Sequence, residues 1–214
     1  MSQWQTVKTW KYTDQTGTLV HCVDRQERTE NGKPEKKFIQ YRNVTGQKVY
    51  NLHGVTPVPL YLPELAKRTG ELLFIVEGEK CCDAVSSLGL LATTASGGCK
   101  AKLDWPKYVQ NRPVAILPDE DRPGYEYALR VATSFHGTGC TIKIVFLSNL
   151  AHTEDVADWI GRGEHRTNSC RSSIRRRFGT ACRSRIVGAA QRNLRRPRGS
   201  RYQSGVPSSS IPTN

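Results

Sequence analysis

No apolar run in the 214-residue chain approaches the roughly 20 residues that a membrane-spanning helix needs, so a transmembrane protein is excluded. The opening stretch MSQWQTVKTWKYTD has no apolar block with a cleavage site, so secretion is not expected. Seven cysteines form no C-x-x-C pair, and their number is odd. This argues against a zinc ribbon and a disulfide scaffold, and we expect a cytoplasmic protein with reduced thiols.

The net charge of +13 is concentrated at one end of the sequence. From Arg162 to Asn214 there are 13 arginines, no lysine and one acid, Glu164, whereas the preceding 161 residues are almost neutral. The basic composition therefore says little about the folded part. Residues 162–214 have no periodicity and predict a disordered tail, for which two interpretations stay open: an arginine-rich arm that binds nucleic acid, or an out-of-frame translation product.

Residues 1–70 predict a β-rich N-terminal segment. Stretches with period-two alternation are joined by turns at residues 14–17 and 43–46, each of which contains a glycine. This pattern is typical of β-hairpins. The sequence PLYLPELAKRTG then predicts a short helix with Pro63 in its first turn and Gly70 beyond its end.

Residues 71–161 predict a second domain, of the α/β class. Apolar segments alternate with segments of helical character, as in a small four-stranded parallel sheet with flanking helices. The expected strands are ELLFIVE, LLATTAS, RPVAILPDED and TIKIVFL. The expected helices are GEKCCDAVSSLGL, PGYEYALRVATSFHG and EDVADWIGRG, and the residues between the second and third strands are expected to form a linker.

Carboxylates stand where two of these strands end. Glu77 ends the first strand, and Asp119 and Asp121 end the third. Parallel sheets bind ligands beyond the carboxyl ends of their strands, and residues two apart in an extended segment point the same way. Such acids repel one another unless a cation neutralises them, and oxygen ligands suit Mg²⁺ or Mn²⁺. Ordinary turn and capping roles are the alternative interpretation.

Several strings together resemble the Toprim domain, in the branch found in phage and plasmid primases and primase-helicases. The strings are V-E-G-E-K-x-x-D-A (residues 76–84), T-x-S-G-G with Lys100, D-W (residues 104–105), I-L-P-D-x-D-x-P-G (residues 116–124) and E-D-V-A-D-W-I (residues 154–160). The resemblance covers about residues 12–160. Glu120 and the pair Cys81 and Cys82 depart from the residues common in that branch, and we expect the two thiols to be buried.

The resemblance implies roles for individual residues. Glu77 matches the general acid/base, Asp119 and Asp121 match metal ligands, Asp155 helps complete the metal environment, and Asp158 is its companion. Lys80 and Lys100 are candidates for contacting phosphates or template, or are simply solvated. Gly78, Gly97 and Gly98 would let backbone approach a ligand closely. The aromatic residues among the hairpin's basic residues form either a base-stacking surface or a small core; they are Trp4, Trp10, Tyr12, Phe38 and Tyr41.

The function implied is that of a DNA primase, which uses Mg²⁺ or Mn²⁺ to synthesise RNA primers from ribonucleotides on a single-stranded DNA template. A replicative helicase is the expected partner, because the sequence contains neither a zinc-binding module nor the P-loop of a helicase motor. Those functions would come from elsewhere, or the chain is a truncated gene product. A Toprim nuclease and an inactive nucleic-acid-binding fragment are the alternatives.

Overall fold

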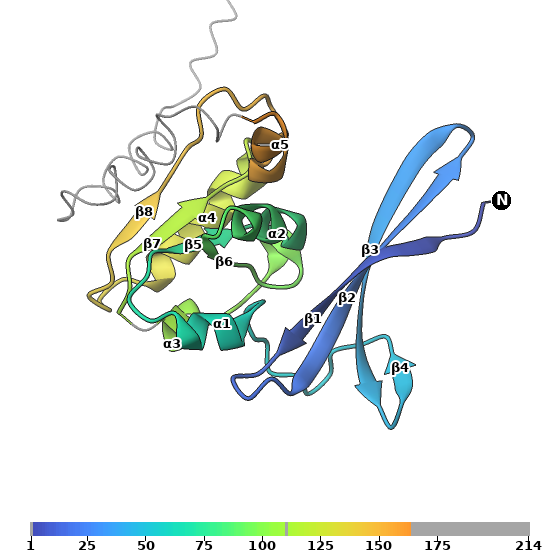
Figure 1. The fold of residues 1–214 in the computed structure, drawn as a ribbon, viewed down its shortest axis with the longest axis horizontal. Helices are drawn as coiled ribbons and strands as arrows, with labels where there is room; N and C mark the ends of the chain where they lie inside the picture. The colour runs from blue at the N-terminus through green and yellow to red at the C-terminus, as the bar shows by residue number, and fades with distance from the viewer. Residues whose placement is uncertain (1, 110, 164–214) are drawn as a thin grey trace, which may run out of the picture. The chain divides into compact units, whose positions relative to one another are not determined.

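The computed structural model describes residues 2–109 and 111–163, which form two four-stranded sheets, the first antiparallel and the second parallel with flanking helices (Figure 1). This confirms the fold class expected from the sequence. Within the described residues, every helix is too short or too polar to cross a bilayer. The predicted tail at 162–214 lies outside the described residues from position 164 onward.

The N-terminal sheet is an antiparallel meander with the order β1-β2-β3-β4. Its strands are β1 (Gln5–Thr13), β2 (Leu19–Glu30), β3 (Lys33–Val44) and β4 (Gln47–Val49). The predicted turn after β1 is held by Asp14, whose carboxylate accepts hydrogen bonds from the backbone N–H groups of Thr16 at 2.9 Å and Thr18 at 3.0 Å. Trp10, Tyr12 and Tyr41 are buried, which favours the core interpretation for these three aromatic residues.

The second sheet has the order β6-β5-β7-β8, and all its strand pairs are parallel. Its strands are β5 (Leu73–Val76), β6 (Leu91–Thr93), β7 (Val114–Leu117) and β8 (Ile142–Ile144). β5 and β7 are buried along their whole length, as continuous apolar runs predict. The helices are α1 (Leu62–Lys67), α2 (Glu79–Ser87), α3 (Trp105–Val109), α4 (Arg122–Ser134) and α5 (Val156–Gly161).

The chain leaves the two central strands in opposite directions. From β5 it runs through α2 to β6 on one side, and from β7 through α4 to β8 on the other. Because such crossovers are right-handed, α2 and α4 cover opposite faces of the sheet. The boundary between β5 and β7 is therefore the topological switch point, where open α/β sheets form a crevice beyond the strand ends.

The segment expected to be a linker is more ordered than the sequence predicted. It contains the 3₁₀ turn η1 (Gly98–Lys100) and α3, whose Trp105 is buried. Arg112, which follows α3, is also buried and donates to the carbonyl oxygens of Val109, Arg68 and Leu65 at 2.8, 3.1 and 2.7 Å. One buried guanidinium thus satisfies the carbonyl ends of two short helices.

Two side chains of β1 join the N-terminal sheet to α2. The Tyr12 hydroxyl donates to the Glu79 carboxylate at 2.8 Å, and both groups are buried. The Tyr12 ring also stacks on His21, with 4.3 Å between centroids. Trp10 Nε1 donates to Asp83 at 2.8 Å. Acids on α2 therefore position the meander beside the parallel sheet.

Candidate active site at the strand ends

Glu77 and Asp119 lie at the switch point, immediately beyond the two central strands. Glu77 follows β5 and Asp119 follows Pro118 after β7. The Thr94 hydroxyl donates to the backbone carbonyl of Glu77 at 3.0 Å, which gives the T-x-S-G-G string a structural role beside the site. The parallel register Val76↔Leu117 brings the two strand ends together, as the sequence predicted for carboxylates at neighbouring strands.

Glu77 is half-buried, and only part of the hydrogen-bonding capacity of its carboxylate is used. Its Oε2 atom is buried and has no hydrogen-bond partner among the described residues. Burial raises the pKa of the Glu77 carboxyl, the Asp121 charge raises it further, and hydrogen bonds from Cys99 oppose the rise. A buried oxygen without a donor is costly, and it is a point at which a cation or a proton would be stabilised.

Asp119 has the most perturbed carboxyl of the site. Burial raises its pKa to about 7, and repulsion from Glu77, Asp155 and Asp121 acts in the same direction. The positive charge of Lys80 opposes these effects without cancelling them. Asp119 and these three acids are therefore near enough to repel one another, and the charged form of Asp119 is strongly disfavoured.

Asp121 is also the N-cap of α4, because its side chain accepts a hydrogen bond from the backbone N–H of Gly124 at 2.7 Å. Gly124 leaves no room for a side chain: an added Cβ would lie 2.6 Å from the carbonyl oxygen of Asp119. The D-x-D-x-P-G string thus encodes a tight strand-to-helix junction as well as the two aspartates.

Glu120 takes part in the fold and not in the cleft. Its side chain accepts a hydrogen bond from the Tyr125 hydroxyl, and its backbone pairs with that of Glu154 and Thr153 at 3.0 and 3.1 Å. The Glu120 side chain therefore contacts the first turn of α4, and its backbone attaches the loop before α5 to the end of β7.

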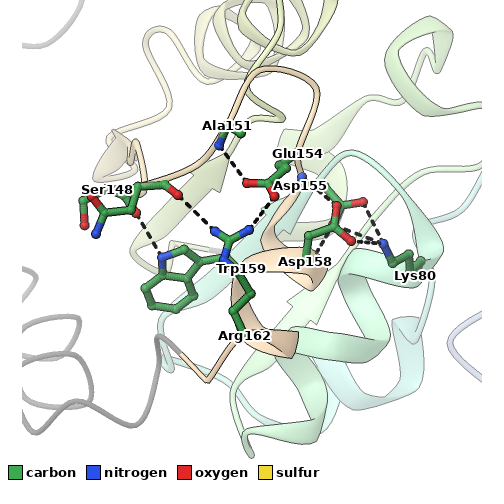
Figure 2. Close-up of polar contacts among 9 residues, drawn as sticks. Lys80, Ser148, Ala151, Glu154, Asp155, Asp158, Trp159 and Arg162 are labelled. Atoms are coloured by element: carbon green, nitrogen blue, oxygen red, sulfur yellow. Dashed lines mark hydrogen bonds and ion pairs between the residues drawn. The ribbon is translucent and has the colours of Figure 1, made fainter.

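Lys80 contacts two carboxylates of α5. Its Nζ lies 2.7 Å from Asp158 Oδ1 and 3.3 Å from Asp155 Oδ2 (Figure 2). Burial tends to lower the pKa of Lys80, but hydrogen bonds and charges of the two aspartates raise it overall. The same contact with Lys80 lowers the pKa of Asp158. This lysine is thus an ion-pair partner and not a freely solvated side chain.

Glu77, Asp119 and Lys80 line a cleft of about 340 Å³ with two chemically different walls, whereas Asp121 is not among its lining residues. One wall is acidic and belongs to the parallel sheet, with Glu77, Asp119 and Asp155 beside Lys80. The other wall comes from β2 and β3 and presents Arg25, Lys36, Phe38, Val23 and Gln40. Gly78, Gly97 and Gly98 also line the cleft, whereas Lys100 and Asp158 are not among its lining residues.

The aromatic residues of the hairpins were expected to form either a base-stacking surface or a small core, and two of them are not buried. Phe38 is 51% exposed and lies against Trp10, with 6.5 Å between ring centroids. Trp4 is half-buried between two cations, with Arg28 and Lys37 at 4.6 and 4.2 Å from its ring centroid. Phe38 is thus the aromatic residue from this set that lines the cleft.

The donor set fits a lightly coordinated magnesium-like ion. Among the described residues, no three histidine, cysteine, aspartate or glutamate side chains are grouped so as to hold a metal ion. Mg²⁺ usually takes one or two carboxylates and completes its shell with water and substrate phosphates. Glu77, with its unpartnered Oε2, and Asp119, whose negative charge is disfavoured without a cation, are two such carboxylates.

Comparison with protein-family models and with curated proteins gave no match to this chain. Several solved structures are similar to it, including the following two. A structure of the DnaG catalytic core superposes with a TM-score of 0.52 at 19% identity, over 72% of this chain and 47% of that chain. The Aquifex aeolicus primase structure, with zinc-binding and RNA polymerase domains, gives a TM-score of 0.53 at 18% identity, over 78% and 38%.

These likenesses establish a primase-like fold for the chain. This chain covers less than half the length of either structure.

Sequence reasoning missed three residues that shape the site. The first is Glu79, which is buried against Tyr12. The others are Arg25 and Lys36, which reach the cleft from the antiparallel sheet. The second carboxylate of V-E-G-E was a visible signal for the first of these. Nothing in the local sequence places β2 and β3 opposite the strand ends, because that contact depends on tertiary packing.

Proposed function

We propose that the chain is a metal-dependent nucleotidyltransferase of the primase type, which synthesises RNA primers on single-stranded DNA in phage or plasmid replication. The cleft carries this proposal, because it places the Glu77 and Asp119 carboxylates opposite Arg25, Lys36 and Phe38. An acidic wall suits a divalent ion and a triphosphate, and a basic wall with an aromatic ring suits a nucleic-acid strand. The motif resemblance and the primase-like fold support the same assignment.

In this proposal Glu77, Asp119 and Asp121 would hold Mg²⁺ or Mn²⁺. When bound, the ion would supply positive charge that favours ionisation of a primer 3′-hydroxyl and stabilises the phosphate oxygens. Glu77 is the carboxylate that we propose accepts the hydroxyl proton, as the family resemblance implies.

The basic wall is proposed to bind the template strand. Arg25 Nη2 pairs with Glu27 at 2.5 Å, and its Nε is buried without a hydrogen-bond partner among the described residues, so this N–H is the donor that remains for a phosphate. Lys36 adds a second positive charge, and the exposed ring of Phe38 offers a face for a base. A replicative helicase would be the partner that supplies unwound DNA.

The test is to incubate the full chain with single-stranded DNA, ribonucleotides and Mg²⁺ or Mn²⁺, and to separate the products on a gel. We expect short oligoribonucleotides, and we expect Asp119→Asn to reduce their yield at least about a hundredfold, as for loss of a group that stabilises the transition state. Glu120→Gln is the matched control, since its carboxylate faces Tyr125, and it should retain synthesis.

Two other outcomes would replace the proposal. Shortened DNA with no RNA product would assign a Toprim nuclease, in which water takes the place of the hydroxyl at the same carboxylates. If neither RNA primers nor shortened DNA are formed, and if Asp119→Asn leaves DNA binding unchanged, the chain is an inactive nucleic-acid-binding fragment.

A further inference from the structure

Four acids that lie in the cleft or next to it form an inner and an outer pair. The inner pair, Glu77 and Asp119, follows the two central strands of the parallel sheet. The outer pair, Asp155 and Asp158, stands at the start of α5. Among residues 2–109 and 111–163, an ion pair is found for the outer pair and not for the inner pair, and its cation is Lys80 of α2.

Each carboxylate of the outer pair is already committed to the fold. Asp155 Oδ1 accepts the backbone N–H of Asp158 at 2.9 Å, and Asp158 Oδ2 accepts the backbone N–H of Asp155 at 3.3 Å. These two bonds form a capping box at the N-terminus of α5. The oxygens that remain, Asp155 Oδ2 and Asp158 Oδ1, are the ones nearest to Lys80 Nζ.

Further contacts fix the position of α5 and hence of these carboxylates. Trp159 is buried and its Nε1 donates to the carbonyl of Ser148 at 3.1 Å (Figure 2). The Glu154 carboxylate accepts the backbone N–H of Ala151 at 2.7 Å and pairs with Arg162. The string E-D-V-A-D-W therefore has a structural account for each of its polar residues.

The inner pair is in the opposite condition. Glu77 Oε2 is buried without a partner among the described residues, and no lysine or arginine contact at hydrogen-bond distance is found for Asp119 there. A diffusible divalent ion would thus gain most by binding at the inner pair. At the outer pair it would have to displace an ammonium group that is tethered to the same protein.

We infer that Lys80 is a positioning residue that serves as the resident cation of Asp155 and Asp158, so that these aspartates hold α5 against α2 while a divalent ion binds at the inner pair and Asp121. The inference rests on the proposed function and narrows its metal site. It also reassigns Asp155, which the family resemblance implies to be part of the metal environment, and Lys80, which was a candidate for contacting phosphate.

The physical basis is competition between two cations for the same oxygens. Lys80 belongs to α2, which packs against α5, so its ammonium group stays close to the outer pair and pays no translational entropy to remain there. Removing that ammonium leaves Asp155, with a side chain 20% exposed, and Asp158, 41% exposed, as neighbouring acids open to solvent. Such a pair attracts a divalent ion.

The experiment counts Mn²⁺ ions bound to the full chain by electron paramagnetic resonance, with Mn²⁺ alone as the probe and no nucleotide present. We expect one bound ion for the unaltered chain and two for Lys80→Met. The second ion should disappear again in Lys80→Met/Asp155→Asn, and Lys80→Arg, which keeps a cation, should bind one. Lys102→Met is the charge-matched control outside the cleft lining, and it should also bind one.

A single bound ion in folded Lys80→Met would overturn the inference. If Lys80→Met does not fold, the variant Asp155→Asn tests the inference instead. We expect Asp155→Asn to lower the melting temperature and to change Mn²⁺ affinity less than about threefold, whereas mutation of metal ligands or of their immediate partners typically costs 10–100-fold. A loss of tenfold or more in Asp155→Asn would make Asp155 a ligand and would overturn the inference.

Failure of this inference differs from failure of the proposed function. If Asp119→Asn abolishes both Mn²⁺ binding and primer synthesis while Lys80→Met binds one ion, only the role of Lys80 is wrong. If the unaltered chain binds no Mn²⁺ and makes no primer, the proposed function is wrong and the inference is overturned with it.

Discussion

At the scale of single residues, the site is built from carboxyl groups in unfavourable positions. Asp119 has a pKa raised to about 7, chiefly by burial, and Glu77 has a buried oxygen without a partner. In the metal-free protein both features cost folding free energy. Such a cost is expected at a site whose ligand compensates it on binding.

The raised pKa of Asp119 predicts that the metal-free chain loses stability as the pH rises. Between about pH 4 and pH 7 the folded Asp119 keeps a proton that the unfolded chain has released, so stability falls across that window and levels off above it. Asp119→Asn removes this loss and should be more stable than the unaltered chain at pH 8 by about 1–2 kcal/mol, after allowance for solvent screening.

Thermal unfolding in the presence of a chelator, measured from pH 4 to pH 8, checks this prediction. The gap between Asp119→Asn and the unaltered chain should close toward pH 4, and Glu120→Gln should show no such gap. A gap that is the same at both ends of the pH range would contradict the pKa shift. Added Mn²⁺ should stabilise the unaltered chain but not Asp119→Asn.

At the scale of elements, the junction between β7 and α4 places Asp119 and Asp121. The first turn of α4 packs so tightly on that junction that Gly124 has backbone atoms of Asp119 in the space of a Cβ. Helices ordinarily favour alanine over glycine by about 1 kcal/mol, so this glycine is retained against its helix propensity.

Gly124→Ala should therefore destabilise the chain, by about 1–3 kcal/mol, because the added methyl group must displace the Asp119 backbone. It should also weaken Mn²⁺ binding, since Asp119 moves with that backbone. Gly161→Ala on α5 is the matched control: its Cβ would meet nothing within 4 Å, and it should stabilise by up to about 1 kcal/mol. Denaturant titration of both variants measures the difference, and equal signs would contradict the packing argument.

The elements of the parallel sheet could be predicted because their signals are local. Continuous apolar runs gave β5 and β7, and prolines and glycines marked the ends of α4. The helix α3 was missed because Pro106, Lys107 and the short length hide any periodicity, and its stability comes from burial of Trp105. The positions of Glu77 and Asp119 after their strands could be predicted from the sequence, whereas the capping roles of Asp121 and Asp155 depend on helix ends that the sequence locates only roughly.

At the scale of the whole molecule, the cleft exists only because the antiparallel sheet faces the strand ends of the parallel sheet. Arg25, Lys36 and Phe38 lie far from the carboxylates in sequence, and no local pattern predicts that they share a wall. Their placement depends on buried contacts such as that of Tyr12 with Glu79. Tertiary packing therefore determines which side chains share the cleft with the acidic wall.

Phe38→Ala should weaken binding of single-stranded DNA by about tenfold, because base stacking on an aromatic ring contributes roughly 1–3 kcal/mol. The same substitution should change binding of an abasic oligonucleotide of equal length and charge very little. Fluorescence anisotropy measures both affinities. Phe146→Ala, which removes a ring that is 60% exposed outside the cleft lining, is the control and should leave both unchanged. Equal losses for the two oligonucleotides would exclude stacking.

The four residues from Glu77 to Lys80 all line the cleft, and two of them also contact other elements. Glu79 is buried against Tyr12 of β1, and Lys80 reaches the start of α5. Since each residue of a helix is turned by about 100° from the one before it, a one-residue insertion here would misdirect all of these contacts at once. Chimeras between this chain and a homologue should consequently fold only when β1, this tetrapeptide and α5 are exchanged as one block.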